Sequence, residues 1–305
     1  MRESFFVFVE HEENLIRLYL CISENKAIKN YLVALRQSNN FSPGFTDEEA
    51  MTIYLYGIMH QLGTVKAIHK HARWYLKSWF PRLPSYQAFN NRLNLVCQAF
   101  GLLSSEIMQQ ASVRFDSCNE NVLDSMPIVV AGRVRSGTAR VAPGVCNKGY
   151  CASKRLYYYG LKLHLCGFVN PGTMPMPEVC WFSSAEENDL TNARPWLERF
   201  YNRKIYADKI YCDAPLNERL IKEQNTTLIT PVKKKIGQLE LDAADRLFST
   251  AVSRIRQPIE SLFNWLNEKT FIQNATKVRS EKGLWTHVWG RMAAALCILA
   301  FEFNP

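Results

Sequence analysis

The chain has 305 residues, of which 47% are apolar and 12% aromatic, so it can bury a sizeable core and is not a disordered protein. Its formal net charge of +9 and isoelectric point of about 9.1 indicate an anionic partner, nucleic acid before a membrane surface. The charge alone also fits an ordinary basic protein. Both parts of the chain contribute, because residues 1–115 carry a net charge of +3 and residues 116–305 a net charge of +6.

Cysteines and apolar runs exclude several other classes. None of the nine cysteines forms a Cys-x-x-Cys pair, and no Cys/His cluster has zinc-ligand spacing, so we expect reduced thiols in a cytoplasmic protein. The apolar run over residues 5–9 is flanked by acids and is not a signal peptide. The apolar run over residues 292–301 is too short to span a bilayer.

The first 115 residues predict a helical domain. Helix-like apolar spacing covers residues 10–22, 26–36, 47–59, 65–79 and 85–100. Thr46 and Glu49 have the spacing of a capping box, with Thr46 as the N-cap of the helix that follows. The last three helices are short and carry a basic group of side chains, namely His69, Lys70, His71, Arg73 and Lys77. They fit a helix-turn-helix-like DNA-binding unit, and equally a helical bundle with a solvated basic face.

The pattern changes to strands near residue 119. We expect strands over residues 122–130, 156–165, 177–182, 204–207 and 227–232, with a loop over 131–153. We expect helices over residues 189–201 and 216–223, and a long helical region from residue 241. Hairpin-like strands followed by alternating strands and helices predict an α/β fold, a mixed sheet with helices on its faces.

Three carboxylates stand out by their position in these elements. Asp124 lies within the first strand, and Asp208 ends the fourth, where open α/β sheets place their sites. Glu260 lies in an amphipathic helix predicted over residues 254–267, within an apolar surround and one turn after Arg256. If the first and fourth strands are neighbours, all three carboxylates can meet. Their repulsion is tolerable when divalent, oxygen-seeking cations such as Mg²⁺ neutralise it.

Other residues offer alternatives to this set. Asp116 lies in a predicted loop, and Asp213 lies past the end of the fourth strand in a predicted turn. Asp189 begins a helix and is better explained as its N-cap than as a ligand. His164 on the second strand either approaches the carboxylates or has a structural role. The Arg256–Glu260 spacing also fits a simple surface ion pair.

Several stretches carry the pattern of a known family, namely residues 80–85, 89–92, 122–127, 149–154, 158–164, 207–211 and 256–263. In these stretches the sequence resembles bacterial insertion-sequence transposases of the DDE class, most closely the insertion-sequence family named nine-eight-two. The resemblance covers nearly the whole chain. It implies an RNase H-like catalytic domain over residues 116–305, preceded by a helical, DNA-end-binding domain over residues 1–115. It also implies that Asp124, Asp208 and Glu260 are the catalytic, metal-binding triad.

The chain departs from the family pattern at two positions. Ile210 stands where the family usually has glycine, and Asn267 stands where related transposases carry a lysine seven residues after the glutamate. The second departure removes a role for a lysine at that position but leaves the triad intact. By the resemblance, Arg256 contacts DNA phosphate or holds Glu260 in place.

Basic residues near the predicted site are candidates for contacts with DNA phosphates, and each also fits a solvated strand edge or loop. Besides Arg256, they are Lys154, Arg155, Lys162, Lys233, Lys234 and Lys235.

The resemblance implies an enzyme that binds the terminal inverted repeats of its own element in double-stranded DNA. It implies phosphodiester cleavage and strand transfer with Mg²⁺, for which Mn²⁺ substitutes, by a homodimer on DNA in the bacterial cytoplasm. Two alternatives are a catalytically inactive DNA-binding protein derived from a transposase and a metal-dependent nuclease without strand transfer.

Overall fold

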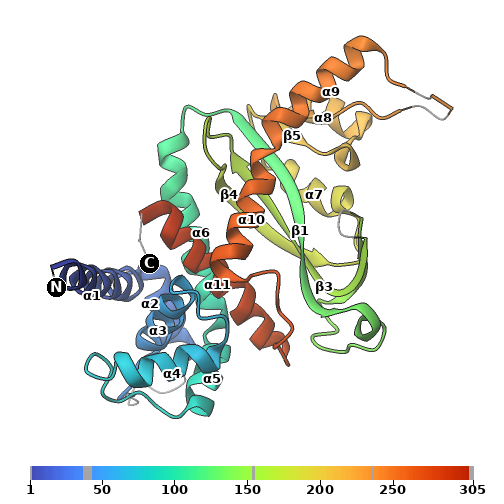
Figure 1. Ribbon diagram of the computed structural model, residues 1–305. Coiled ribbons are helices and arrows are strands. Elements are labelled where there is room, and N and C mark those ends of the chain that lie inside the picture. The colour runs from blue at the N-terminus through green and yellow to red at the C-terminus, as the bar shows by residue number, and fades with distance from the viewer. Residues whose placement is uncertain (1, 37–42, 153–154, 235–236, 239, 302–305) are drawn as a thin grey trace. The chain divides into compact units, whose positions relative to one another are not determined.

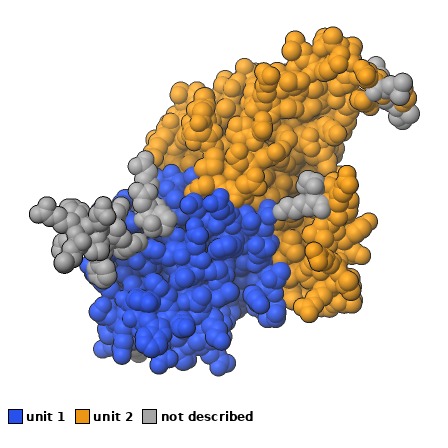
Figure 2. Space-filling model, in the orientation of Figure 1, with its two compact units in different colours: residues 1–107, 266–305 blue, residues 108–265 orange. Residues whose placement is uncertain are grey.

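The computed structural model of the chain describes residues 2–36, 43–152, 155–234, 237–238 and 240–301. The chain divides into two compact units, coloured separately in Figure 2. Unit 1 contains residues 1–107 and 266–305, and unit 2 contains residues 108–265. This division differs from the predicted domains 1–115 and 116–305, because residues 266–305 group with the N-terminal helices rather than with the sheet.

Unit 1 is helical, as the apolar spacing predicts. Its helices are α1 (Arg2–Ser23), α2 (Lys26–Leu35), α3 (Asp47–Met59), α4 (Val65–Tyr75), α5 (Tyr86–Leu95), most of α6 (Cys97–Ser112), the end of α10 (Pro258–Thr270) and α11 (Glu281–Phe301). The helix predicted over residues 85–100 is in fact two helices, α5 and α6. The connection between α4 and α5 spans residues 76–85, which is longer than the turn of three or four residues in a helix-turn-helix.

Helix α3 is the core of unit 1. The predicted capping box is confirmed, since the Glu49 backbone N–H donates to Thr46 Oγ1 (3.1 Å) and the Thr46 backbone N–H donates to Glu49 Oε2 (2.6 Å). All its residues except Glu48 and Glu49 are buried, because α1, α4, α5 and α11 pack around it. A Cβ on Gly290 of α11 would lie 2.4 Å from a ring carbon of Tyr54, so only glycine permits this approach.

Helix α11 has the length and apolar composition of a membrane-spanning helix, but 72% of its most apolar window is buried within the fold. The apolar run over residues 292–301, which the sequence analysis found too short to span a bilayer, is only the second half of this helix.

Unit 2 contains the predicted sheet (Figure 1). Its strands are β1 (Glu120–Gly132), β2 (Asn147–Cys151), β3 (Leu156–Phe168), β4 (Met176–Ser184), β5 (Lys204–Ala207) and β6 (Thr227–Ile229). Its other elements are α7 (Asp189–Leu197), α8 (Ala214–Gln224), α9 (Ala243–Arg256), the start of α10, and the 3₁₀ turns η1 (Val113–Phe115), η2 (Arg133–Gly137) and η3 (Lys209–Tyr211).

The order of the strands is that of an RNase H-like core. The sheet runs β2-β3-β1-β5-β6, with β4 also paired to β3. β3 pairs antiparallel with β1, β2 and β4, whereas β1, β5 and β6 are parallel. The predicted α/β fold with a mixed sheet flanked by helices is therefore confirmed, and the first and fourth predicted strands are neighbours, as the site prediction required.

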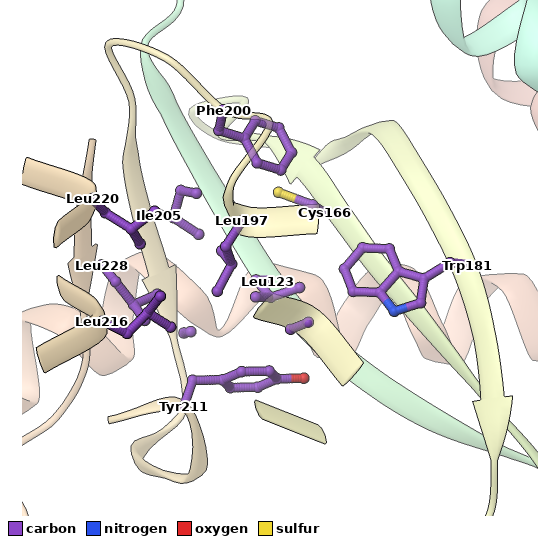
Figure 3. Packing of buried hydrophobic residues seen from close by; sticks show 12 residues of the cluster. Leu123, Cys166, Trp181, Leu197, Phe200, Ile205, Tyr211, Leu216, Leu220 and Leu228 are labelled. Atoms are coloured by element: carbon purple, nitrogen blue, oxygen red, sulfur yellow. The ribbon is translucent and has the colours of Figure 1, made fainter. Parts of the chain in front are cut away.

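One face of this sheet is closed by α7 and α8. Leu123 and Ile205 from the strands meet Leu197 of α7 and Leu216 of α8 in a buried cluster, which Figure 3 shows with Trp181 at its edge. Successive residues of a strand point to opposite faces, so Leu123 enters this cluster while Asp124 turns to the other face.

Two further predicted elements were wrong. The loop predicted over residues 131–153 contains a strand, β2, which pairs with the first part of β3. The helix predicted over residues 254–267 is two helices, since α9 ends at Arg256 and α10 begins at Pro258. Proline suits the first position of a helix because its missing N–H would have no partner there.

Candidate active site

The two predicted aspartates come together because β1 and β5 are parallel neighbours. Leu123 pairs with Ala207 in the register, so Asp124 and Asp208 are the next residues on each strand. β5 ends at that point, and Asp208 caps the turn η3 by accepting a hydrogen bond from the Lys209 backbone N–H. The two carboxylates thus lie at one edge, where β5 ends beside β1.

Arg256 joins Asp124 to Glu260. Its Nη1 donates to Asp124 Oδ2 at 2.7 Å, and its Nη2 donates to Glu260 Oε1 at 2.8 Å. The side chains of Arg256 and Asp124 are only 16% and 20% exposed. The ion pair between Arg256 and Glu260 is the i,i+4 pair that the spacing allowed, and Arg256 also reaches across to the strand.

The expected burial of Glu260 was wrong, because 56% of its side chain is exposed. The apolar residues around it, Ile259, Leu262, Phe263 and Leu266, are buried, whereas Glu260 lies on the open side of α10. Water therefore solvates the charge of Glu260. The pair with Arg256 is not needed to offset a cost of burying this carboxylate.

Negative charge accumulates at Asp124. The pKa of its carboxyl is raised from 3.8 to about 6, chiefly by burial and to a smaller extent by the charges of Asp208 and Glu260. The Ser125 backbone N–H and Arg256 oppose this shift but do not cancel it. The carboxylates of Asp208 and Glu260 are therefore close enough to act on Asp124.

The donor chemistry of this group fits a hard divalent cation, because all three side chains offer carboxylate oxygens and their charge is incompletely neutralised. As the side chains lie, no three His, Cys, Asp or Glu residues in the described parts of the chain are gathered tightly enough to hold a metal ion. Arg256 donates hydrogen bonds to one oxygen of Asp124 and to one oxygen of Glu260.

The alternative residues have other roles. Asp213 caps α8 and pairs with Arg194 at 2.5 Å, and Asp116 is exposed after η1. His164 is fully buried, with Nε2 2.7 Å from Ser183 Oγ and its ring stacked on Trp181. These contacts are structural.

Asp189 was misread as a helix cap. The cap of α7 is Asn188, whose side chain accepts from the backbone N–H groups of Leu190 and Thr191. Asp189 is instead buried, accepts a hydrogen bond from Ser125 Oγ at 2.9 Å and pairs with Lys162 at 2.6 Å. This network fixes β1 at Ser125, the residue directly after Asp124. In the sequence, the only indication of it was that a serine follows Asp124.

The predicted phosphate-binding residues are dispersed. Lys162 Nζ donates hydrogen bonds to Asp189 Oδ1 and to the Glu187 carbonyl oxygen, at 2.6 Å each. Arg155 is exposed beside β3, and Lys233 and Lys234 are exposed after β6. Lys154 and Lys235 lie outside the described residues.

Comparison with known proteins gives one match, to the family model described as Transposase DDE domain, over residues 121–298. No curated protein and no solved structure matches the chain. The matched segment contains all three carboxylates and Arg256, and it covers more than half of the chain. The chain therefore belongs to the DDE transposase family.

Proposed function

We propose that this protein is an active DNA transposase whose catalytic residues are Asp124, Asp208 and Glu260. The observation that carries the proposal is the meeting of these carboxylates at the edge where β5 ends, with the pKa of Asp124 raised by burial and, to a smaller extent, by its two acidic neighbours. Perturbed carboxylates at the carboxyl end of parallel strands are typical of catalytic sites.

DDE transposases generally use divalent metal ions, and we propose Mg²⁺, with Mn²⁺ as a substitute, held by the same three carboxylates. The ion would activate a water or a 3′-hydroxyl and stabilise the leaving oxygen. The protein's own contribution is to hold Asp124 on a paired strand and to balance its charge with Arg256 until the substrate binds. If Asp124 and Glu260 held the ion, the guanidinium of Arg256 would be available for a DNA phosphate.

Unit 1 supports the proposed binding of element ends. Residues 50–105 contain no Asp or Glu but six Lys and Arg residues. Four of them, Lys66, Lys70, Arg73 and Lys77, recur at spacings of three and four and are exposed on or just after α4. His69 does not join this face, because it is buried and its Nε2 lies 2.9 Å from the Pro84 carbonyl oxygen. We propose that this basic face contacts DNA phosphates.

The narrower features rest on the sequence resemblance. We propose that the protein belongs to the insertion-sequence family nine-eight-two, recognises terminal inverted repeats, acts as a homodimer on DNA and works in the bacterial cytoplasm. Two ends must be brought together for strand transfer, which favours at least a dimer on DNA.

The test is cleavage of a labelled duplex that carries the element's own end, with Mg²⁺, with EDTA, and with the Glu260→Gln variant. We expect cutting to require the metal and to disappear in Glu260→Gln while DNA binding survives. Glu218→Gln, on the exposed side of α8, is the matched control and should cut normally. A strand-transfer assay with a target duplex then tests joining.

Three results would overturn parts of the proposal. Normal cutting by Glu260→Gln would remove this residue from the active site. Binding without cutting by the unaltered protein would favour a DNA-binding protein derived from a transposase. Metal-dependent cutting without joining would favour a nuclease.

A further inference from the structure

A hollow of about 590 Å³ opens on unit 2. Its lining includes Ile210, two residues after Asp208, and Asp189, whose side chain is bonded to Ser125 on the face of β1 opposite Asp124. The lining also includes Tyr150 of β2 and Tyr157 of β3. The hollow therefore lies between the turn that follows β5 and the β2–β3 hairpin.

The two tyrosines form an exposed aromatic surface, which we call the tyrosine platform. Tyr150 and Tyr157 are direct partners across β2 and β3, their ring centroids are 4.8 Å apart, and they are 50% and 58% exposed. The Lys148 ammonium lies over one face of the Tyr157 ring, 5.2 Å from its centre. Paired exposed rings add little to a core, but they offer flat faces on which another planar group can stack.

A second hollow, of about 440 Å³, adjoins the platform and shares Lys148 and Tyr157 with the first. Its lining adds Arg133 and Arg155, both exposed and both with positive φ angles of 53° and 46°. Non-glycine residues seldom adopt this backbone conformation. The turns on either side of β2 thus present two guanidinium groups next to the platform.

The charge of this region is one-sided. Residues 125–177, which include η2, β2 and β3, contain seven Lys and Arg residues and no Asp or Glu. The acidic residues of the first hollow are Glu186 and Glu187, from the segment between β4 and α7, and Asp189 of α7, which pairs with Lys162. A phosphate chain is therefore attracted to the second hollow, and hydrogen-bond donors are attracted to the first.

We infer that the tyrosine platform binds an unpaired nucleotide of single-stranded DNA, with its base stacked on Tyr157 and its phosphates beside Arg133, Arg155 and Lys148. A base within a duplex has both faces covered by its neighbours, so these rings engage a base only when it is unstacked. This inference rests on the proposed function, because it places a separated strand of the DNA substrate beside the cut.

The acidic side of the first hollow determines which bases fit. Glu186 accepts a hydrogen bond there from Asn147 Nδ2 (2.7 Å), and Glu187 accepts from the Ser184 backbone N–H (3.1 Å) and from Asn192 Nδ2. Their remaining lone pairs accept from an exocyclic amino group, which adenine, cytosine and guanine carry and thymine lacks. The site therefore prefers adenine and cytosine to thymine.

The experiment measures binding of short single-stranded oligonucleotides of about ten nucleotides to the full chain in EDTA, so that no cutting occurs. One adenine is replaced by 2-aminopurine, whose fluorescence reports on stacking. We expect Tyr157→Ala to weaken binding roughly 5- to 150-fold and to abolish the fluorescence change, whereas Tyr157→Phe, which keeps the ring, binds normally. We expect Arg155→Ala to reduce the salt dependence by about 0.7 in the slope of log K against log salt.

Tyr201→Ala is the matched control, because Tyr201 is 61% exposed on the same unit and lines neither hollow. Unchanged binding by Tyr157→Ala, or an equal loss with Tyr201→Ala, would overturn the inference. Tyr150→Ala provides a second, independent variant at the platform. Equal affinity for thymine and adenine oligonucleotides would overturn the role given to Glu186 and Glu187.

The failure of this inference can be told apart from failure of the proposed function. If the protein binds single strands through Tyr157 but never cuts the element end, only the proposed function fails. If it cuts the end with Mg²⁺ but binds single strands independently of Tyr157, only the inference about the platform fails.

Discussion

At the scale of single residues, Arg256 determines the electrostatics of the candidate active site. It pairs with Asp124 at 2.7 Å and with Glu260 at 2.8 Å, so the two carboxylates share one positive charge. The sequence spacing predicted the contact with Glu260. The contact with Asp124 depends on how α9 packs against β1, which spacing alone cannot give.

The raised pKa of Asp124 predicts a pH-dependent stability. In the folded protein this carboxyl titrates near 6 instead of 3.8, so its contribution to stability is full below about pH 4 and is lost as the pH rises through 6. Asp124→Asn removes that cost, and we expect it to be about 1–2 kcal/mol more stable than the unaltered protein at pH 8 in EDTA. Thermal unfolding at pH 8 and pH 4 measures this, and the difference should shrink at pH 4. A lower melting temperature for Asp124→Asn at pH 8 would show that the pair with Arg256 outweighs desolvation.

At the scale of elements, the sequence predicted the strands and helices that have strong apolar patterns. It missed β2 because Asn147–Cys151 is short, contains glycine and exposes three of its five residues. It joined α9 to α10 because the apolar spacing continues through Pro258, and the break depends on a single proline. The three catalytic candidates were found by position, whereas the network of Asp189 with Ser125 and Lys162 needed the fold.

Removing the N-cap of α3 tests the capping box. Thr46→Ala leaves the Glu49 backbone N–H without its partner, and we expect a loss of about 1 kcal/mol in the free energy of unfolding. Thr46→Ser keeps the hydroxyl and should differ little. Urea unfolding of the three proteins gives both values, and equal losses for alanine and serine would contradict the cap.

The close approach of β3 to β1 gives a second prediction for an element. A Cβ on Gly160 would lie 2.0 Å from the Ile128 carbonyl oxygen, beside the irregular register at Val129 and Ala131. We expect Gly160→Ala to lower the free energy of unfolding by about 1–3 kcal/mol or more, because backbone must move. Gly137→Ala, where nothing lies within 4 Å, is the control. Similar melting temperatures for both variants would disprove the steric conflict.

At the scale of the whole molecule, unit 1 is assembled from both ends of the described chain. Arg291 of α11 is only 4% exposed, and it donates to the carbonyl oxygens of Gly63 (2.8 Å) and Thr270 and to His287 Nδ1 (3.1 Å). No carboxylate partners it within the described chain, and burial lowers its pKa. A single buried cation therefore links α11 to two other segments of unit 1, which no local pattern in the sequence could predict.

Replacing this arginine tests the link. Arg291→Ala leaves buried carbonyl groups without donors, and we expect a loss of about 3–5 kcal/mol in the free energy of unfolding. Arg279→Ala, on the exposed connection before α11, should change it by less than about 0.5 kcal/mol. Thermal unfolding compares the two, and a small effect of Arg291→Ala would show that water replaces the guanidinium.

The division of unit 1 between residues 1–107 and 266–305 has a consequence for the order in which the protein folds during synthesis. Residues 108–265 leave the ribosome as a complete unit and can fold first. The N-terminal helices must wait, with the side of α3 that α11 covers still exposed, until α11 has emerged. A translation product that stops before residue 281 would therefore contain a finished sheet and an unfinished helical unit, and we expect such a product to be cleared by chaperones and proteases rather than to act on DNA.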